Sequence, residues 1–158
     1  MRRLALLAVL PAIALAAAAA WAAPATDVLR IRIDGVIAPS TARYLQRAIR
    51  DAEASNAAAL LVELDTPGGL LKSMEDMTRA MLNAPVPIIV YISPSGARAA
   101  SAGVFVTYAA NIAAMAPATR IGAAHPVSVG QGGTEQESAS MEKVTNDAVA
   151  GIRAIAKR

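Results

Sequence analysis

Cysteine is absent from this 158-residue sequence, and histidine occurs only once. The lack of cysteine excludes disulfides, thiol catalysis and thiolate metal sites, and it is compatible with an exported protein that needs no disulfides. A single histidine without a surrounding cluster of carboxylates argues against a metal enzyme, so we expect neither a metal nor a cofactor. The basic residues are scattered and are not interleaved with aromatic residues, which argues against nucleic-acid binding.

The N-terminal segment has the composition of a secretory signal peptide. Two arginines follow Met1, an apolar run covers residues 4–20, and Ala20-Trp21-Ala22 offers small residues for cleavage after position 22. The alternative is an uncleaved membrane anchor, which Pro11 and the small residues at the exit disfavour. We predict a signal peptide over residues 1–22, a linker over 23–27 and one exported domain over 28–158.

Beyond the leader, strand-like and helix-like patterns alternate along the chain. Short apolar runs rich in β-branched residues are typical of buried parallel strands, and the segments between them repeat apolar residues at helical spacing. This alternation predicts an α/β layered fold with a mainly parallel sheet flanked by helices. The predicted strands are 28–33, 58–65, 88–92 and 112–116, and the predicted helices are 40–55 (capped by Ser40 or Thr41), 70–82, 100–110 and 139–157.

Two segments have neither pattern. Residues 117–126 predict a loop or an irregular extended piece. Residues 128–138 are polar and rich in glycine, and we expect this segment to be mobile.

Two turns fall at the carboxyl ends of predicted strands, where parallel sheets form their sites. Gly68-Gly69 ends one strand, and Ser101 lies in a turn of alanine and glycine after the next. Ser101 is either a helix cap or an exposed nucleophile at a helix N-terminus. Pro67-Gly68-Gly69 is either a plain turn or a source of free N–H groups, which together with the amide of Ala102 would bind an oxyanion.

A nucleophilic serine needs a base, and the sequence offers two. His125 is the only histidine, and Lys143 opens the last predicted helix. A lysine acts as a base only when it is neutral, which burial in an apolar pocket favours; Met141 and Val144 near Lys143 are compatible with such a pocket. The alternatives are a solvated helix lysine and a loop histidine bonded to backbone.

Three ordered motifs resemble a known family. Asp65-Thr66-Pro67-Gly68-Gly69, then Ala99-Ala100-Ser101-Ala102-Gly103, then residues 115–126 are similar to the periplasmic protease domain of NfeD-type proteins. These are membrane-bound serine proteases of the ClpP class, related to signal peptide peptidase A. The resemblance covers essentially everything after the leader and implies a ClpP/crotonase-like fold.

The resemblance also implies a mechanism. Ser101 would be the nucleophile, Lys143 the general base, and the amides of Gly69 and Ala102 the oxyanion hole. The family's substrates are hydrophobic, membrane-associated polypeptides, its habitual partner is a stomatin-like membrane protein, and a homodimer or higher oligomer is expected. His125 lies near where soluble ClpP proteases place their catalytic histidine, so a Ser101–His125 pair is the alternative; no acid is evident to orient it, and Asp147 is a weak candidate.

Family members continue with membrane-spanning helices and a further C-terminal domain, so we expect this sequence to be a truncated form or a fragment of a longer protease. Two functions compete with an endopeptidase. One is an inactive interaction domain that partners a stomatin-like protein, and the other is a crotonase-type acyl-CoA enzyme. The export signal argues against the latter, because CoA chemistry is cytoplasmic.

Overall fold

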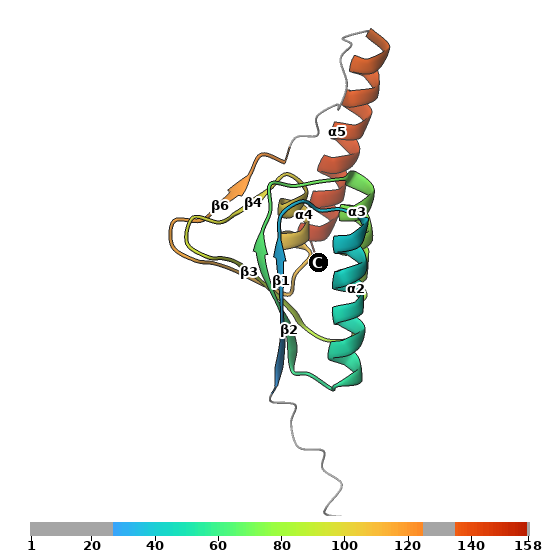
Figure 1. The fold of residues 1–158 in the computed structure, drawn as a ribbon. Coiled ribbons are helices and arrows are strands. Elements are labelled where there is room, and N and C mark those ends of the chain that lie inside the picture. The colour runs from blue at the N-terminus through green and yellow to red at the C-terminus, as the bar shows by residue number, and fades with distance from the viewer. Residues whose placement is uncertain (1–26, 125–134, 158) are drawn as a thin grey trace, which may run out of the picture.

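The computed structural model describes residues 27–124 and 135–157. Helices pack against one side of a parallel sheet, and a short pair of strands lies on the other side (Figure 1). The strands are β1 (Val28–Asp34), β2 (Ala59–Asp65), β3 (Ile88–Ile92), β4 (Arg98–Ala100), β5 (Ile112–Met115) and β6 (Arg120–Gly122), and the helices are α2 (Pro39–Ala54), α3 (Leu71–Leu82), α4 (Ala102–Tyr108) and α5 (Glu135–Ala156).

The main sheet has four parallel strands in the order β1-β2-β3-β5. Its register places Ile31 beside Val62 and Val62 beside Val90, and all three side chains are buried. Alternate residues of these strands point to the helix-covered face, which explains the β-branched runs in the sequence. The α/β fold class with a parallel sheet flanked by helices is confirmed.

α2 and α3 bury apolar stripes against this face. Leu45 of α2 and Met77 of α3 are fully buried, and helical spacing brings further apolar residues to the same sides. The prediction that Ser40 or Thr41 caps the first helix is wrong, because α2 begins at Pro39 and has no side-chain cap. Proline at the first helical position lacks the N–H that a cap would satisfy. The Thr41 hydroxyl instead donates to the carbonyl of Val36 (3.0 Å).

The segment before α4 was predicted as helix from residue 100, and this is wrong. Arg98–Ala100 is β4, which pairs in parallel with β6, a strand inside the segment predicted to be irregular. α4 therefore begins at Ala102. The pairing of β4 with β6 fixes the point at which the chain turns from strand to helix.

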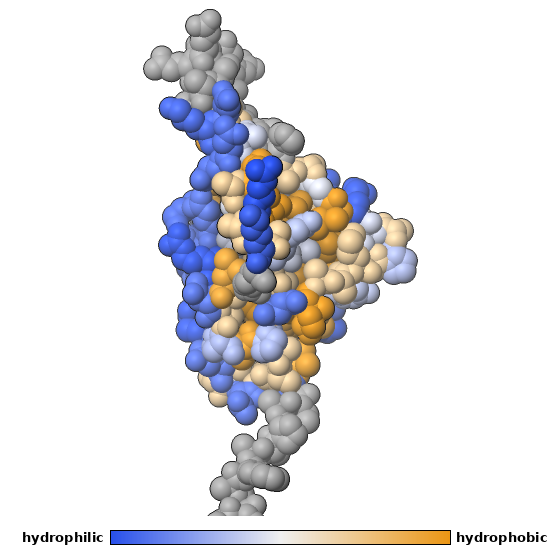
Figure 2. Space-filling view, turned by 180° about the vertical axis from the view of Figure 1, so that it is seen from behind, coloured by the Kyte–Doolittle hydropathy of each residue, from blue (hydrophilic) through white to orange (hydrophobic). Residues whose placement is uncertain are grey.

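The last helix begins earlier than the predicted residue 139, because α5 starts at Glu135. Residues 135–138 are thus helical rather than part of a mobile loop, whereas the rest of the predicted mobile segment and the predicted leader lie outside the described residues. Within the described ranges, no helix is long and apolar enough to cross a membrane. Apolar side chains also reach the surface on the face turned away in Figure 1 (Figure 2), and Ile112 and Met115 of β5 are among the exposed large hydrophobic residues.

Candidate active site

Ser101 is the single residue between β4 and α4. Its backbone has φ 52° and ψ −117°, a conformation that residues with a side chain rarely adopt. The Ser101 N–H donates to the carbonyl of Gly122 in β6 (3.0 Å), and its own carbonyl accepts from Val104 (3.0 Å). The hydroxyl makes no capping hydrogen bond, so the helix-cap interpretation is not supported. A serine on a strained strand-to-helix turn is the geometry in which hydrolases expose a nucleophile.

The Gly68-Gly69 turn lies directly against Ser101. A Cβ atom added to Gly68, whose φ is +110°, would lie 2.7 Å from the Cβ of Ser101. A Cβ added to Gly69 would lie 2.0 Å from the carbonyl oxygen of Ile37. Both positions therefore require glycine, one for its backbone conformation and its closeness to the serine, the other for the approach of a neighbouring backbone.

The backbone around this turn leaves N–H groups available near Ser101. The N–H of Ile37 donates to the carbonyl of Gly68 (2.8 Å), and the carbonyl of Ile37 accepts from the N–H of Leu70 (2.9 Å). The N–H of Gly69 takes no part in these two bonds. Ala102 is the first residue of α4, where N–H groups have no partner within the helix. Neither N–H has a recorded acceptor among the described residues.

Thr66 joins the two turns and was not singled out from the sequence. It is fully buried, its hydroxyl accepts from the N–H of Gly68 (3.0 Å), and its backbone bonds to Arg98 (2.7 Å) and Ala100 (3.0 Å) of β4. A Cβ added to Gly103 would lie 2.5 Å from the methyl carbon of Thr66. The signal in the sequence was its place between the strand and Pro67-Gly68-Gly69, since threonine bonds its own backbone in turns.

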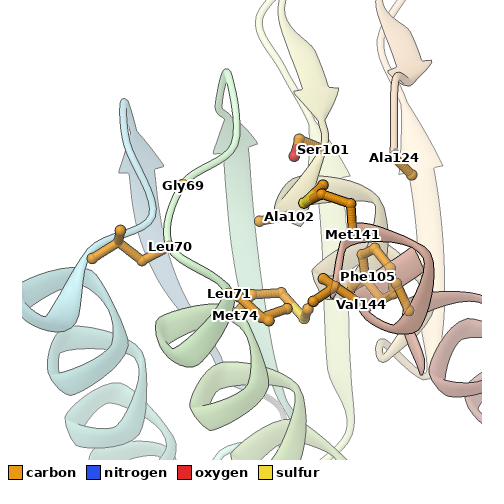
Figure 3. A pocket seen from close by; sticks show the side chains of 11 residues that line it. Gly69, Leu70, Leu71, Met74, Ser101, Ala102, Phe105, Ala124, Met141 and Val144 are labelled. Carbon is orange, nitrogen blue, oxygen red and sulfur yellow. The ribbon is translucent and has the colours of Figure 1, made fainter. Parts of the chain in front are cut away.

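An apolar pocket opens beside Ser101. Its volume is about 360 Å³, and Figure 3 shows it between α3 and α5, with Ser101, Ala102 and Gly69 around its edge. Its walls are Leu71 and Met74 of α3, Phe105 of α4, and Met141, Val144 and Ala148 of α5. The pocket has the apolar lining that takes an apolar side chain of a ligand.

Of the two proposed bases, only Lys143 lies among the described residues. Lys143 is exposed on α5 and does not line the pocket, because Met141, Val144 and Ala148 form the face of α5 that does. His125 lies outside the described residues. The structure therefore brings together Ser101, Gly69 and Ala102 at one pocket, and Lys143 is not among the described residues that line it.

The chain is thus an α/β domain that places a serine between a strand and a helix, with a glycine turn and an apolar pocket beside it. Residues 27–154 match the family described as NfeD1b, N-terminal domain, and the chain belongs to this family. It is 37% identical over 129 residues to the membrane-bound protease PH1510 of Pyrococcus horikoshii. It is 32% identical over 109 residues to the membrane protein NfeD1b of Bacillus subtilis.

These matches cover 80% and 69% of this chain, but only 28% and 24% of the two relatives. Among solved structures, a serine-to-alanine mutant of the 1510-N membrane-bound stomatin-specific protease superposes with a TM-score of 0.75 at 34% identity, covering 84% of this chain and 64% of that one. A lysine-to-alanine mutant of the same protease, in complex with a substrate peptide, gives 0.75 at 32%, covering 85% and 61%. The fold is thus that of the 1510-N protease domain, and the chain spans about a quarter of the two curated relatives.

Proposed function

We propose that this domain is a serine endopeptidase in which Ser101 is the nucleophile. The observation that carries the proposal is the strained backbone of Ser101 between β4 and α4, with its hydroxyl free of a capping bond at the edge of an apolar pocket. The N–H groups of Gly69 and Ala102 would stabilise the oxyanion formed when the Ser101 Oγ attacks a peptide carbonyl. Loss of one such donor typically lowers the rate about 10²- to 10³-fold.

Lys143 is the proposed general base. It would take the Ser101 proton during attack and give it to the leaving amine. Its side chain is exposed here, and its neighbour Val144 lines the pocket. Adjacent residues of an α-helix project about 100° apart, so Lys143 lies to one side of the face of α5 that lines the pocket. A relative solved with one lysine replaced and a substrate peptide bound supports a lysine in this role.

 The proposed substrate is a hydrophobic polypeptide segment of a membrane-associated protein. The pocket beside Ser101 supports a hydrophobic substrate, because aliphatic, thioether and aromatic side chains line it. The solved relatives are described as stomatin-specific, so we propose a stomatin-like membrane protein as the substrate or partner. We also propose that the domain acts outside the cytoplasm at a membrane, in line with the membrane-bound relatives.

The nucleophile is tested by labelling with a fluorophosphonate probe and by cleavage of an apolar peptide, followed by mass spectrometry. Ser101→Ala should abolish both signals. Ser95→Ala is the matched control, since Ser95 is an exposed serine in the loop before β4. Labelling that persists in Ser101→Ala would assign the reactivity to another residue and refute the proposal.

The base is tested separately, in the same peptide assay. Lys143→Ala should abolish cleavage, whereas Lys157→Ala, at another exposed lysine near the end of the chain, should leave it unchanged. Full activity in Lys143→Ala together with loss in His125→Ala would replace the lysine by the histidine as the base.

The exposure of Lys143 favours one second function, that of an inactive interaction domain for a stomatin-like membrane protein. Such a domain would use the apolar pocket to hold a hydrophobic segment without cleaving it. It predicts peptide binding that is equal in the wild-type protein and in Ser101→Ala, with no cleavage and no probe labelling. Labelling that depends on Ser101 would exclude this function.

A further inference from the structure

Two arginines lie side by side on the strand pair that leads to Ser101. β4 and β6 pair in parallel with Arg98 as the register partner of Arg120, and Figure 1 shows this pair on the side of the sheet away from α2 and α3. Both side chains are exposed, and both line a cavity of about 230 Å³ together with Ile121 and Gly122. Neighbouring strands are about 4.8 Å apart, so the two side chains leave the backbone within a few ångströms of each other.

This arrangement places like charges together, and among the described residues neither guanidinium forms an ion pair. Like charges directly across a strand pair destabilise it. Asp65 is close, but its carboxylate accepts the backbone N–H of Arg98 (3.0 Å) rather than a guanidinium. A bound anion between the two guanidinium groups would relieve their repulsion.

The arginine pair is tied to the nucleophile by the same two strands. Arg98 is three residues before Ser101, and Gly122, two residues after Arg120, accepts the Ser101 N–H (3.0 Å). At the rise of a strand, three residues span about 10 Å. An extended peptide that has its reactive carbonyl at Ser101 and runs alongside β4 and β6 would therefore reach the arginine pair about three residues from that carbonyl.

We propose that Arg98 and Arg120 bind a carboxylate of the polypeptide substrate, from an acidic side chain or from its C-terminus, a few residues from the bond at Ser101. This inference rests on the proposed endopeptidase function and adds a polar specificity site to the apolar pocket. Guanidinium groups present donors in a planar fork that matches a carboxylate, and two of them can hold its two oxygens at once.

The test measures peptide binding, so that it does not depend on turnover. The probes are apolar 12-residue peptides that are labelled with fluorescein and amidated at the C-terminus. Each peptide carries one glutamate or one glutamine, and the position of this residue differs from peptide to peptide. Their affinity for the Ser101→Ala variant is measured by fluorescence anisotropy. We expect the glutamate peptide to bind about two- to fivefold more tightly than the glutamine peptide at one or two positions. Arg98→Gln/Arg120→Gln should remove this difference, and Arg43→Gln, at an exposed arginine of α2, should retain it. Glutamine peptides with a free C-terminal carboxylate distinguish the two sources of the anion.

Three results would overturn the inference: equal binding of glutamate and glutamine peptides at every position, a preference that survives in the double variant, or a double variant that loses only its binding to phosphatidylglycerol vesicles. The last result would assign the arginines to a membrane surface. Cleavage of the glutamine peptide by the wild-type protein is measured in parallel. Its absence would refute the endopeptidase function alone, because the binding preference is measured without cleavage.

Discussion

The contact between Gly103 and Thr66 determines how closely α4 can approach the end of β2. A Cβ atom at Gly103 would lie 2.5 Å from the Thr66 methyl carbon and 3.4 Å from the Cβ of Ala99, and both neighbours are fully buried. Overpacking a core typically costs about 1–3 kcal/mol. Alanine recovers about 0.5–1 kcal/mol of this through its better helix propensity. Gly103→Ala should therefore lower the free energy of unfolding by about 1–2 kcal/mol.

A second substitution should reverse this loss. Thr66→Ser removes the methyl group that the new Cβ would meet and keeps the hydroxyl that bonds to Gly68. Alone it should cost about 1 kcal/mol, the value of one buried methyl group. In the double variant the Cβ of Ala at position 103 occupies the space left by the methyl, so its stability should match or exceed that of Thr66→Ser. The expected coupling between the two sites is about 1–2 kcal/mol.

Urea unfolding of the four proteins measures this coupling, and thermal melting should show shifts of about 2–4 °C per kcal/mol for a chain of this size. Gly151→Ala is the control, because no atom lies within 4 Å of a Cβ added there, and it should leave stability unchanged or raise it. If the two changes add within about 0.5 kcal/mol, or if Gly103→Ala costs nothing, the inferred contact between α4 and Thr66 is refuted.

Three further predictions concern the turn, the pocket and the sheet. Gly68→Ala should abolish fluorophosphonate labelling, because the new Cβ would meet Ser101. Gly35 also has a positive φ but has open space around it, so Gly35→Ala should lower the free energy of unfolding by about 1 kcal/mol and leave labelling intact. Equal labelling in both variants would contradict this prediction. Met74→Ala should destabilise the domain by about 2–4 kcal/mol, because Met74 is buried. It should also shift the cleavage preference toward peptides with larger apolar side chains, measured by mass spectrometry of mixed peptides. An unchanged preference would mean that the pocket does not bind substrate. Glu63→Gln removes an ion pair whose Arg30 side is exposed and whose Glu63 side is partly buried, and it should change stability by less than about 1 kcal/mol in urea unfolding. A larger loss would contradict the exposure of Arg30.

The main sheet and its helices could be predicted from the sequence because burial leaves a local pattern. The apolar run at Ile88–Ile92 predicted both ends of β3 correctly, because a strand that lies between two others is mostly apolar along its length. α3 differs from its prediction by one residue at its start, because helical spacing of apolar residues marks the buried side of a helix. In both cases the signal lies within the segment itself.

β4 and β6 carried no such local signal. Each has only three residues, and alanine and glycine make up half of the six positions. They are strands because they bond to each other and because β4 also bonds to Thr66, and these contacts join segments that are far apart in the chain. The turn at Ser101 depends on this pairing, so its strained conformation could not be predicted either.

The exposure of Lys143 follows from the helical pattern of its segment. Met141, Val144, Ala148, Ile152 and Ile155 repeat at the spacing of one helix face, and the structure packs residues of this stripe against the pocket and the core. Lys143 falls outside the stripe and is exposed. Apolar neighbours in sequence were compatible with a buried lysine, but helical periodicity places those neighbours and the lysine on different sides.

The backbone of Ser101 leads to a last prediction, which separates stability from function. A residue with a side chain at φ 52° and ψ −117° carries strain of about 1–3 kcal/mol, whereas glycine adopts mirror-image conformations freely. Glycine also gives the unfolded chain more freedom, which offsets about 0.5–1 kcal/mol. Ser101→Gly should therefore be as stable as the wild type or up to about 2 kcal/mol more stable in urea unfolding, and Ser101→Ala should not show this gain. Both variants should lose probe labelling. If Ser101→Gly is destabilised instead, the serine contributes to folding, and the inference that its hydroxyl is retained for chemistry rather than for stability fails.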